Sequence, residues 1–222
     1  METEDLANFC CESLRPPIFG LYNFWCTLSG LPMFLVPIIA WRAALAQRAP
    51  PPVMLWMIAM AAMFIVGTVE HAVGPGWCGP FGVVQMVTVQ NVLQAGSLAS
   101  SPMPLTVLVA GIPGMVFFFC QPATVKLVCQ VMDGLVSPYV ICAMGWRSRS
   151  DAYGRCLFAV MCASFPILFS SVASEPNICD RPYGAIFHAT ATHGSLVLLF
   201  GSVSLLRLQI AQSESKSHGK MA

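Results

Sequence analysis

The stretch at residues 53–73, VMLWMIAMAAMFIVGTVEHAV, decides the fold class of this chain. It carries one carboxylate, Glu70, and it is as long as the roughly 20 apolar residues that an α-helix needs to cross a bilayer. The remainder of the chain has the same character: 56% of the 222 residues are hydrophobic, 9% are charged, and the mean hydropathy is +0.70. These values lie outside the range of soluble globular domains. The sequence therefore predicts an all-α, multi-pass integral membrane protein.

Further apolar runs on both sides of this stretch predict a bundle of seven transmembrane helices. The third is the weakest, because amide side chains interrupt it, and a six-helix count is the alternative. Short loops with turn chemistry join the runs, so we expect one membrane domain over residues 1–208 and a polar, disordered tail over 209–222. The expected spans are residues 18–41, 53–73, 81–100, 103–120, 123–144, 153–172 and 183–206.

The cations predict the orientation, because short cytosolic loops collect Lys and Arg. With seven spans, eight cations fall on the side of the carboxyl terminus, and only Arg15, Lys126 and Arg181 fall on the other. The amino terminus should then be lumenal and the carboxyl terminus cytosolic, in the endoplasmic reticulum or Golgi. The opening METEDLANFCCES lacks the pattern of a cleaved signal peptide, so the first span is expected to be retained. The net charge of +1 and the absence of a long basic run exclude nucleic acid as a partner.

This topology brings three histidines to the lumenal ends of their helices: His71, His188 and His193. An imidazole inside a membrane needs a partner or a function. Three imidazoles and one open position are the ligand set of a catalytic zinc site. The alternative is that each is a hydrogen-bonded interior or interfacial side chain. His188 and His193 are five residues apart and rotated by about 140° on a regular helix, so joint binding of one metal requires a π-bulge or a helix that begins between them.

The segment before and within the first predicted span carries a family resemblance. Cys11 and Glu12, followed by the run NFWCTLSG at residues 23–30, resemble the opening of the alkaline ceramidase family, W-C-E-x-N-Y followed by A-E-F-W-N-T-x-S-N. The segments around His71 and His188 resemble that family's S-x-x-x-H and H-x-x-x-H motifs. The resemblance, to a divergent member of these seven-helix amide hydrolases of the CREST superfamily, implies zinc-dependent hydrolysis of ceramide to sphingoid base and fatty acid.

Carried over residue by residue, the resemblance implies zinc ligation by His71, His188 and His193, the last one position later than in the family. It implies that Glu12 and Asn23 belong to a calcium site, with Asn23 in the place of a family glutamate. Hard cations need several oxygen ligands, so this calcium site would be weak.

The family's catalytic side chains match this sequence less directly than its zinc ligands do. Gly67 stands where the family has its serine, and Thr68 follows it and can supply a hydroxyl. The family's aspartate has no counterpart here, because no Asp or Glu occurs from His71 to Val131, which leaves Glu70 as the nearest carboxylate. Thr68 and Glu70 are therefore the expected catalytic residues. The alternative for Glu70 is an interfacial charge pointing away from the site.

Two other features need a partner. Cys10, Cys11, Cys78 and Cys179 lie at the predicted lumenal end, where disulfides are permitted. We expect a Cys11–Cys179 bond, which would tie the amino-terminal segment to the last lumenal loop and which the family resemblance also implies. Asp133 lies deep in a predicted span and should pair with a polar group of the third span or line a proton or substrate path.

Three classes of function remain: a zinc-dependent ceramide hydrolase acting on a lipid substrate, a catalytically degenerate relative that binds lipid, and a small transporter. The sequence does not fix the oligomeric state.

Overall fold

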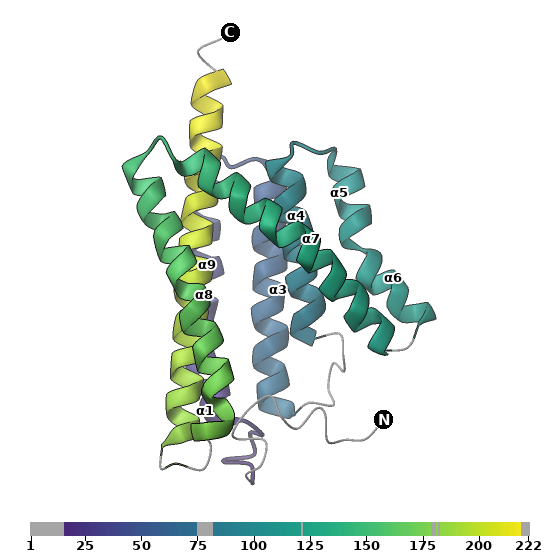
Figure 1. Cartoon of the computed structure of the whole chain (residues 1–222), viewed down its shortest axis with the longest axis vertical. Coiled ribbons are helices and arrows are strands. Elements are labelled where there is room, and N and C mark those ends of the chain that lie inside the picture. Colours follow the sequence, from purple (N-terminus) through teal and green to yellow (C-terminus); the bar gives the residue numbers. More distant parts are fainter. Residues whose placement is uncertain (1–15, 75–81, 121, 179–180, 182, 219–222) are drawn as a thin grey trace.

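The computed structural model describes residues 16–74, 82–120, 122–178, 181 and 183–218. Apart from an isolated bridge between Ile18 and Leu21, the regular structure in these residues is helical, which confirms the all-α prediction. Figure 1 shows the helices as an elongated bundle with α8 beside α9 and α7 crossing obliquely. The elements are α1 Phe24–Gly30, the 3₁₀ helix η2 Leu31–Phe34, α2 Leu35–Ala46, α3 Pro51–Val73, α4 Gly82–Leu98, α5 Met103–Ala110, α6 Ile112–Phe119, α7 Pro122–Ser148, α8 Ala152–Ile178 and α9 Gly184–His218.

Five of the described segments are long and apolar enough to cross a membrane: Phe24–Ala46, Pro51–Val73, Thr124–Ser148, Ala152–Ser174 and Gly184–Glu214. The third predicted span is α4, which has 17 residues and carries the four amides that weakened the prediction. The fourth is divided at Gly111 into α5 and α6, and its apolar part, Met103–Val116, is shorter still. The membrane character is thus supported by five spans, and the count of seven is not confirmed in the described residues.

The first span begins later than residue 18, because the segment before it docks onto the end of another helix. The backbone N–H groups of Tyr22 and Asn23 donate to the carbonyls of Ala72 and His71, at 2.9 and 2.8 Å. The last carbonyls of an α-helix have no partner in their own helix. The chain before α1 therefore caps α3, and helical structure starts only at Phe24.

The described part of the predicted disordered tail is helical, because α9 continues to His218. Its extension is held to neighbouring helices: Arg147 of α7 forms a salt bridge with Glu214, and Gln209 donates to the carboxylate of Asp151. These contacts give the extension tertiary support, on which most helical stability in proteins depends.

The core runs along α3, which packs against α4 on one side and α9 on the other. Phe64 of α3 meets Phe200 of α9 edge to face, with 5.2 Å between ring centroids, and Met57 and Met60 are fully buried beside it. This packing holds α3 and α9 side by side. The carboxyl-terminal end of α3 therefore lies near the amino-terminal part of α9.

A polar cluster joins α4 to α7 in the middle of the bundle. Thr88 donates to Asp133 Oδ2 and Asn91 to Asp133 Oδ1, both at 2.8 Å, and Asn91 also reaches Ser137 Oγ at 3.2 Å. The predicted pairing of Asp133 with the third predicted span is confirmed. A charged group inside a membrane is retained when it is paired in this way, so Asp133 needs no transport path to account for it.

Candidate functional site

The candidate site lies where the end of α3 meets the beginnings of α1 and α9, at the lower end of the bundle in Figure 1. The docking of Tyr22 and Asn23 onto the carbonyls of Ala72 and His71 holds α1 against the last turn of α3. Gly74 closes the helix by donating to the Glu70 carbonyl at 2.9 Å, with φ of +106°, a conformation that favours glycine. The position of His71 is therefore fixed by main-chain bonds on both sides of it.

His71 and His193 meet at this end. Their ring centroids are 5.5 Å apart with an interplanar angle of 66°, although 122 positions separate the two residues in the sequence. His193 is buried and His71 is half-buried. The structure thus brings together two of the three histidines that the sequence analysis placed at one end of the bundle.

Ser29 of α1 contacts His193. Its Oγ lies 2.7 Å from Nδ1 of His193 and 2.7 Å from the carbonyl oxygen of Trp25 one turn earlier. Sequence analysis did not assign this serine a role in the site. The signal was present in the sequence, because Ser29 lies within the F-W-x-T-x-S run on which the family resemblance rests.

Thr68 lies in the space beside these rings. A Cβ placed on Gly30 would meet Thr68 Oγ1 at 3.5 Å and His193 Cε1 at 3.8 Å, so the hydroxyl and the imidazole flank the same small gap. Thr68 Oγ1 is buried and has no hydrogen-bond partner among the described residues. Buried hydroxyls are nearly always paired, so this one is available to a bound molecule.

His188 lies on a different face of α9. Its Nδ1 is 3.2 Å from the carbonyl oxygen of Ser171 in α8, and α9 is a regular α-helix through both His188 and His193. The bulge that would have aligned the two side chains is absent, and the helix begins before both. His188 still interacts electrostatically with His71 and His193. Within the described part of the chain, however, no three His, Cys, Asp or Glu side chains are grouped so as to hold a metal ion.

The remaining predicted residues fall into two sets. Glu70 is partly exposed on the last turn of α3, one residue from His71 and hence about 100° around the helix. Asn23 is buried, and its Oδ1 has no hydrogen-bond partner among the described residues. Glu12, Cys11 and Cys179 lie outside the described residues, so the calcium site and the disulfide remain predictions.

An open groove of about 490 Å³ leads to His193 between α1 and α9. Its walls are mainly apolar and include Trp25, Leu28 and Leu198, and its polar side chains are Ser29, Thr190 and His193. Mostly apolar clefts with a few convergent polar groups are typical of sites for small organic ligands. Leu28 and Leu198 are about half exposed, so the groove opens on the apolar outside of the bundle.

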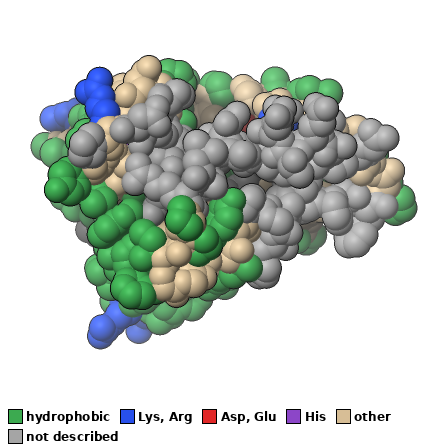
Figure 2. All heavy atoms as spheres, turned by 90° about the horizontal axis from the view of Figure 1, so that it is seen from below, with side chains coloured by type: hydrophobic (Ala, Val, Ile, Leu, Met, Phe, Trp, Pro, Cys, Tyr) green, Lys and Arg blue, Asp and Glu red, His purple; other side chains and the backbone are tan. Residues whose placement is uncertain are grey.

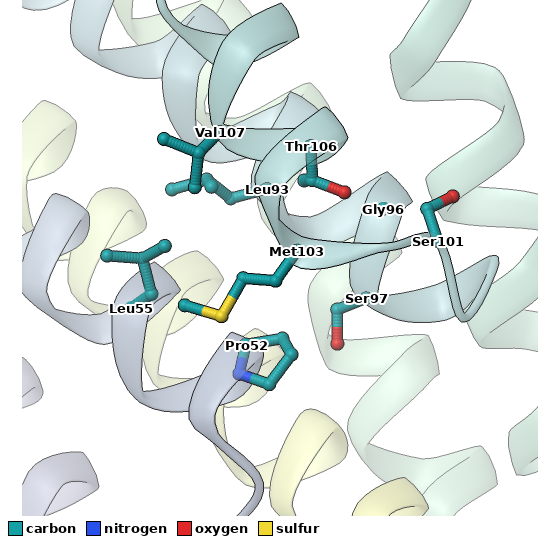
Figure 3. A pocket seen from close by; sticks show the side chains of 9 residues that line it. All are labelled: Pro52, Leu55, Leu93, Gly96, Ser97, Ser101, Met103, Thr106 and Val107. Atoms are coloured by element: carbon teal, nitrogen blue, oxygen red, sulfur yellow. The ribbon is translucent and has the colours of Figure 1, made fainter.

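A second cavity, near the opposite ends of α3 and α4, is too small to be a ligand site. Figure 3 shows it between Pro52, Leu93, Ser97 and Met103. Its volume of about 10 Å³ is at the limit of what one water molecule needs. The groove beside His193 is therefore the better candidate for ligand binding.

The described surface at the lower end of the bundle is mainly hydrophobic. Figure 2 looks onto this end and shows apolar and uncharged side chains over most of the described area, with Lys and Arg at its edges. Such a surface suits a ligand that approaches from a lipid environment.

Comparison with known proteins gives no match: no family model, no curated protein and no solved structure matches the chain. The case for a function therefore depends on the site itself.

Proposed function

We propose that this chain is a membrane hydrolase that cleaves the amide bond of ceramide or a related lipid, with its centre at Ser29, Thr68, His71 and His193. The observation that carries the proposal is that the His71 ring and the buried Thr68 hydroxyl, which has no hydrogen-bond partner among the described residues, both lie beside His193, and that His193 lines an apolar groove. The alkaline ceramidase resemblance of residues 23–30 supplies the substrate class.

The groove supports a lipid substrate. An acyl chain would lie against Leu28 and Leu198, which are apolar and reachable from the outside of the bundle. Burying apolar surface contributes about 25 cal/mol per Å². A chain in the groove would bring the polar linkage of the lipid next to His193, the polar group that shares its wall with Ser29.

Thr68 has the properties of an oxyanion donor. Its hydroxyl is buried and has no partner among the described residues, so it can donate to a developing negative charge without first breaking a hydrogen bond. One such donor contributes about 10²- to 10³-fold in kcat. Glu70 is the carboxylate nearest to His71 in the sequence, and we assign it the transfer of a proton to the leaving amine.

Zinc is the proposed cofactor, held by His71 and His193 with His188 as the third donor. Imidazole nitrogen is a preferred zinc ligand, and the rings of His71 and His193 already lie edge to face, with centroids 5.5 Å apart. His188 bonds the Ser171 carbonyl through Nδ1, so it would bind a metal through Nε2. The grouping of three is not formed in this arrangement, so recruitment of His188 requires a local change in α9. When bound, zinc would supply Lewis-acid chemistry. Calcium at Asn23 and Glu12 is proposed as a weaker, structural ligand.

The proposal is tested by metal analysis and ceramide hydrolysis on the same detergent-purified samples of wild type, His71→Ala, His188→Ala and His193→Ala. His218→Ala is the matched control, because His218 is the fourth histidine of the chain and lies at the far end of α9. We expect stoichiometric zinc and turnover in wild type and His218→Ala, and loss of both in the other variants. Wild type without zinc and without turnover would contradict the proposal.

The second candidate is a lipid-binding relative without catalysis. It is favoured by the absence of a three-residue metal group among the described residues and by Gly67 at the family's serine position. Ceramide binding in the groove with no turnover in any variant would establish it. The proposed topology in either case is a lumenal amino terminus and a cytosolic carboxyl terminus in the endoplasmic reticulum or Golgi.

A further inference from the structure

The hydroxyl of Ser29 lies between two groups that set its hydrogen-bonding role. It is 2.7 Å from the Trp25 carbonyl oxygen and 2.7 Å from His193 Nδ1. A hydroxyl has one proton to donate and two lone pairs with which to accept. A carbonyl oxygen can only accept, and two oxygens at 2.7 Å repel unless a proton lies between them. Ser29 therefore donates its hydroxyl proton to the carbonyl oxygen of Trp25.

With its proton on the Trp25 carbonyl, Ser29 Oγ can only accept from His193. We infer that Ser29 is a positioning residue that holds His193 as the tautomer with its proton on Nδ1, so that the lone pair lies on Nε2. This inference deepens the proposed function and rests on it for its catalytic meaning, because an imidazole nitrogen that carries a proton cannot bind a metal or accept a proton.

A different acceptor holds His188 in the same tautomer. Its Nδ1 faces the carbonyl oxygen of Ser171 at 3.2 Å, and a carbonyl cannot donate, so the proton is again on Nδ1. Ser171 is held in turn by a hydrogen bond of 2.7 Å between its Oγ and Thr192 Oγ1. Two separate acceptors, a hydroxyl from α1 and a carbonyl from α8, thus impose the same tautomer on two histidines of α9. Metal-binding histidines are commonly oriented by such outer partners.

Thr27 offers a matched control within α1. Its Oγ1 donates to the Asn23 carbonyl one turn earlier at 2.8 Å, which is the same bond that Ser29 makes to Trp25. Among the described residues, the Thr27 hydroxyl makes no hydrogen bond to a histidine. Thr27→Val and Ser29→Ala each remove one hydroxyl from α1, but only the second removes the acceptor of His193.

The experiment is ¹⁵N NMR of the metal-free, full-length protein in detergent, with histidine labelled at both ring nitrogens. The chain has four histidines, so single substitutions assign the signals. We expect His193 to be protonated on Nδ1 in wild type, in Thr27→Val and in the hydroxyl-retaining Ser29→Thr. In Ser29→Ala we expect a mixture of the two neutral tautomers. His193 protonated on Nε2 in wild type, or an unchanged tautomer in Ser29→Ala, would overturn the inference.

Zinc titration of the same variants links the tautomer to the proposed function. Loss of an outer partner typically weakens metal binding by about 10- to 100-fold, which we expect for Ser29→Ala and not for Thr27→Val. If no variant binds zinc, the proposed function fails while the NMR result still decides the role of Ser29. If zinc binds equally to wild type and Ser29→Ala, the positioning role is refuted although the metal site stands.

Discussion

At the scale of single residues, the site contains one buried hydroxyl, that of Thr68, with no hydrogen-bond partner in the described part of the chain. Thr68 is buried in α3, and its Oγ1 lies beside the same small gap as the His193 ring. A buried polar group without a hydrogen bond costs roughly 1–3 kcal/mol of stability. Such a cost is retained where the group acts on something else, and sites of this kind are often functional.

Thr68→Val should therefore separate stability from activity. Valine has nearly the same shape and removes an unsatisfied hydroxyl, so the free energy of unfolding in detergent should stay unchanged or rise, by up to about 1–3 kcal/mol. Ceramide hydrolysis should fall by about 10²- to 10³-fold, the value of one oxyanion donor.

Thr106→Val is the control for this substitution. Thr106 is also buried, but its hydroxyl donates to the Pro102 carbonyl at 3.3 Å in α5. We expect it to lose about 0.5–1.5 kcal/mol of stability with no change in turnover. Equal turnover in wild type and Thr68→Val would remove Thr68 from the catalytic centre.

At the scale of helices, the sequence predicted the segments well and their local geometry less well. The meeting of His71 with His193 follows from counting spans, because residues near the same side of the membrane share a depth. The face that each side chain occupies does not follow from counting. The rotation of His188 toward α8 depends on whether α9 contains an extra residue in one turn, which composition does not encode.

The start of the first span could not be predicted from the sequence either. Residues 18–23 are apolar enough to continue a helix, and the prediction began it at Ile18. The backbone N–H groups of Tyr22 and Asn23 instead bind carbonyls of α3, and this choice depends on a partner that is distant in the chain. Helix propensity is a weak prior when tertiary bonds compete with it.

The cap of α8 gives a prediction for pH. Asp151, which lies outside the membrane spans, accepts from the Gly154 backbone N–H at 2.6 Å and from Gln209. The Gly154 N–H, followed by the Gln209 amide, lowers the pKa of this carboxyl below its usual value. A lowered pKa in the folded state means that Asp151 stabilises the protein fully above the unfolded pKa of about 3.9. The contribution is lost as the pH falls through the lower folded value.

Asp151→Asn should flatten this part of the stability curve, because asparagine caps a helix without titrating. The measurement is the thermal midpoint in detergent between about pH 7 and pH 3, with the wild type losing more on acidification than the variant. Parallel curves for the two proteins would show that the cap does not contribute to acid stability.

At the scale of the whole molecule, the groove between α1 and α9 connects the site to the outside of the bundle. Gly194 lines this groove, and a Cβ added at Gly194 would meet no atom within 4 Å. Side chains can therefore be added there without strain in the core. Gly201 lies two turns further along α9 and also has open space, but it does not line the groove.

Gly194→Leu should obstruct the groove while leaving the bundle intact. We expect hydrolysis of long-chain ceramide to fall at least tenfold and hydrolysis of a short-chain analogue to fall less, because the shorter chain occupies less of the groove. Gly201→Leu should leave both rates unchanged. Competition between long- and short-chain substrates in mixed micelles measures the effect, and equal losses for both lengths would argue against an acyl chain in this groove.

The bond between the segment before α1 and the end of α3 has a consequence for how this chain can diverge. The contact uses the amide groups of Tyr22 and Asn23 and the carbonyls of Ala72 and His71, so its geometry places almost no demand on the identity of the side chains at 22 and 23. The exception is proline, which has no N–H to donate. Relatives of this sequence should therefore reject proline at both positions, while the side chains there are limited only by the burial of Asn23 and by the close approach of the Tyr22 ring to Gly74. Substitutions at these positions that never include proline would show that selection maintains the main-chain hydrogen bonds even where the side chains change.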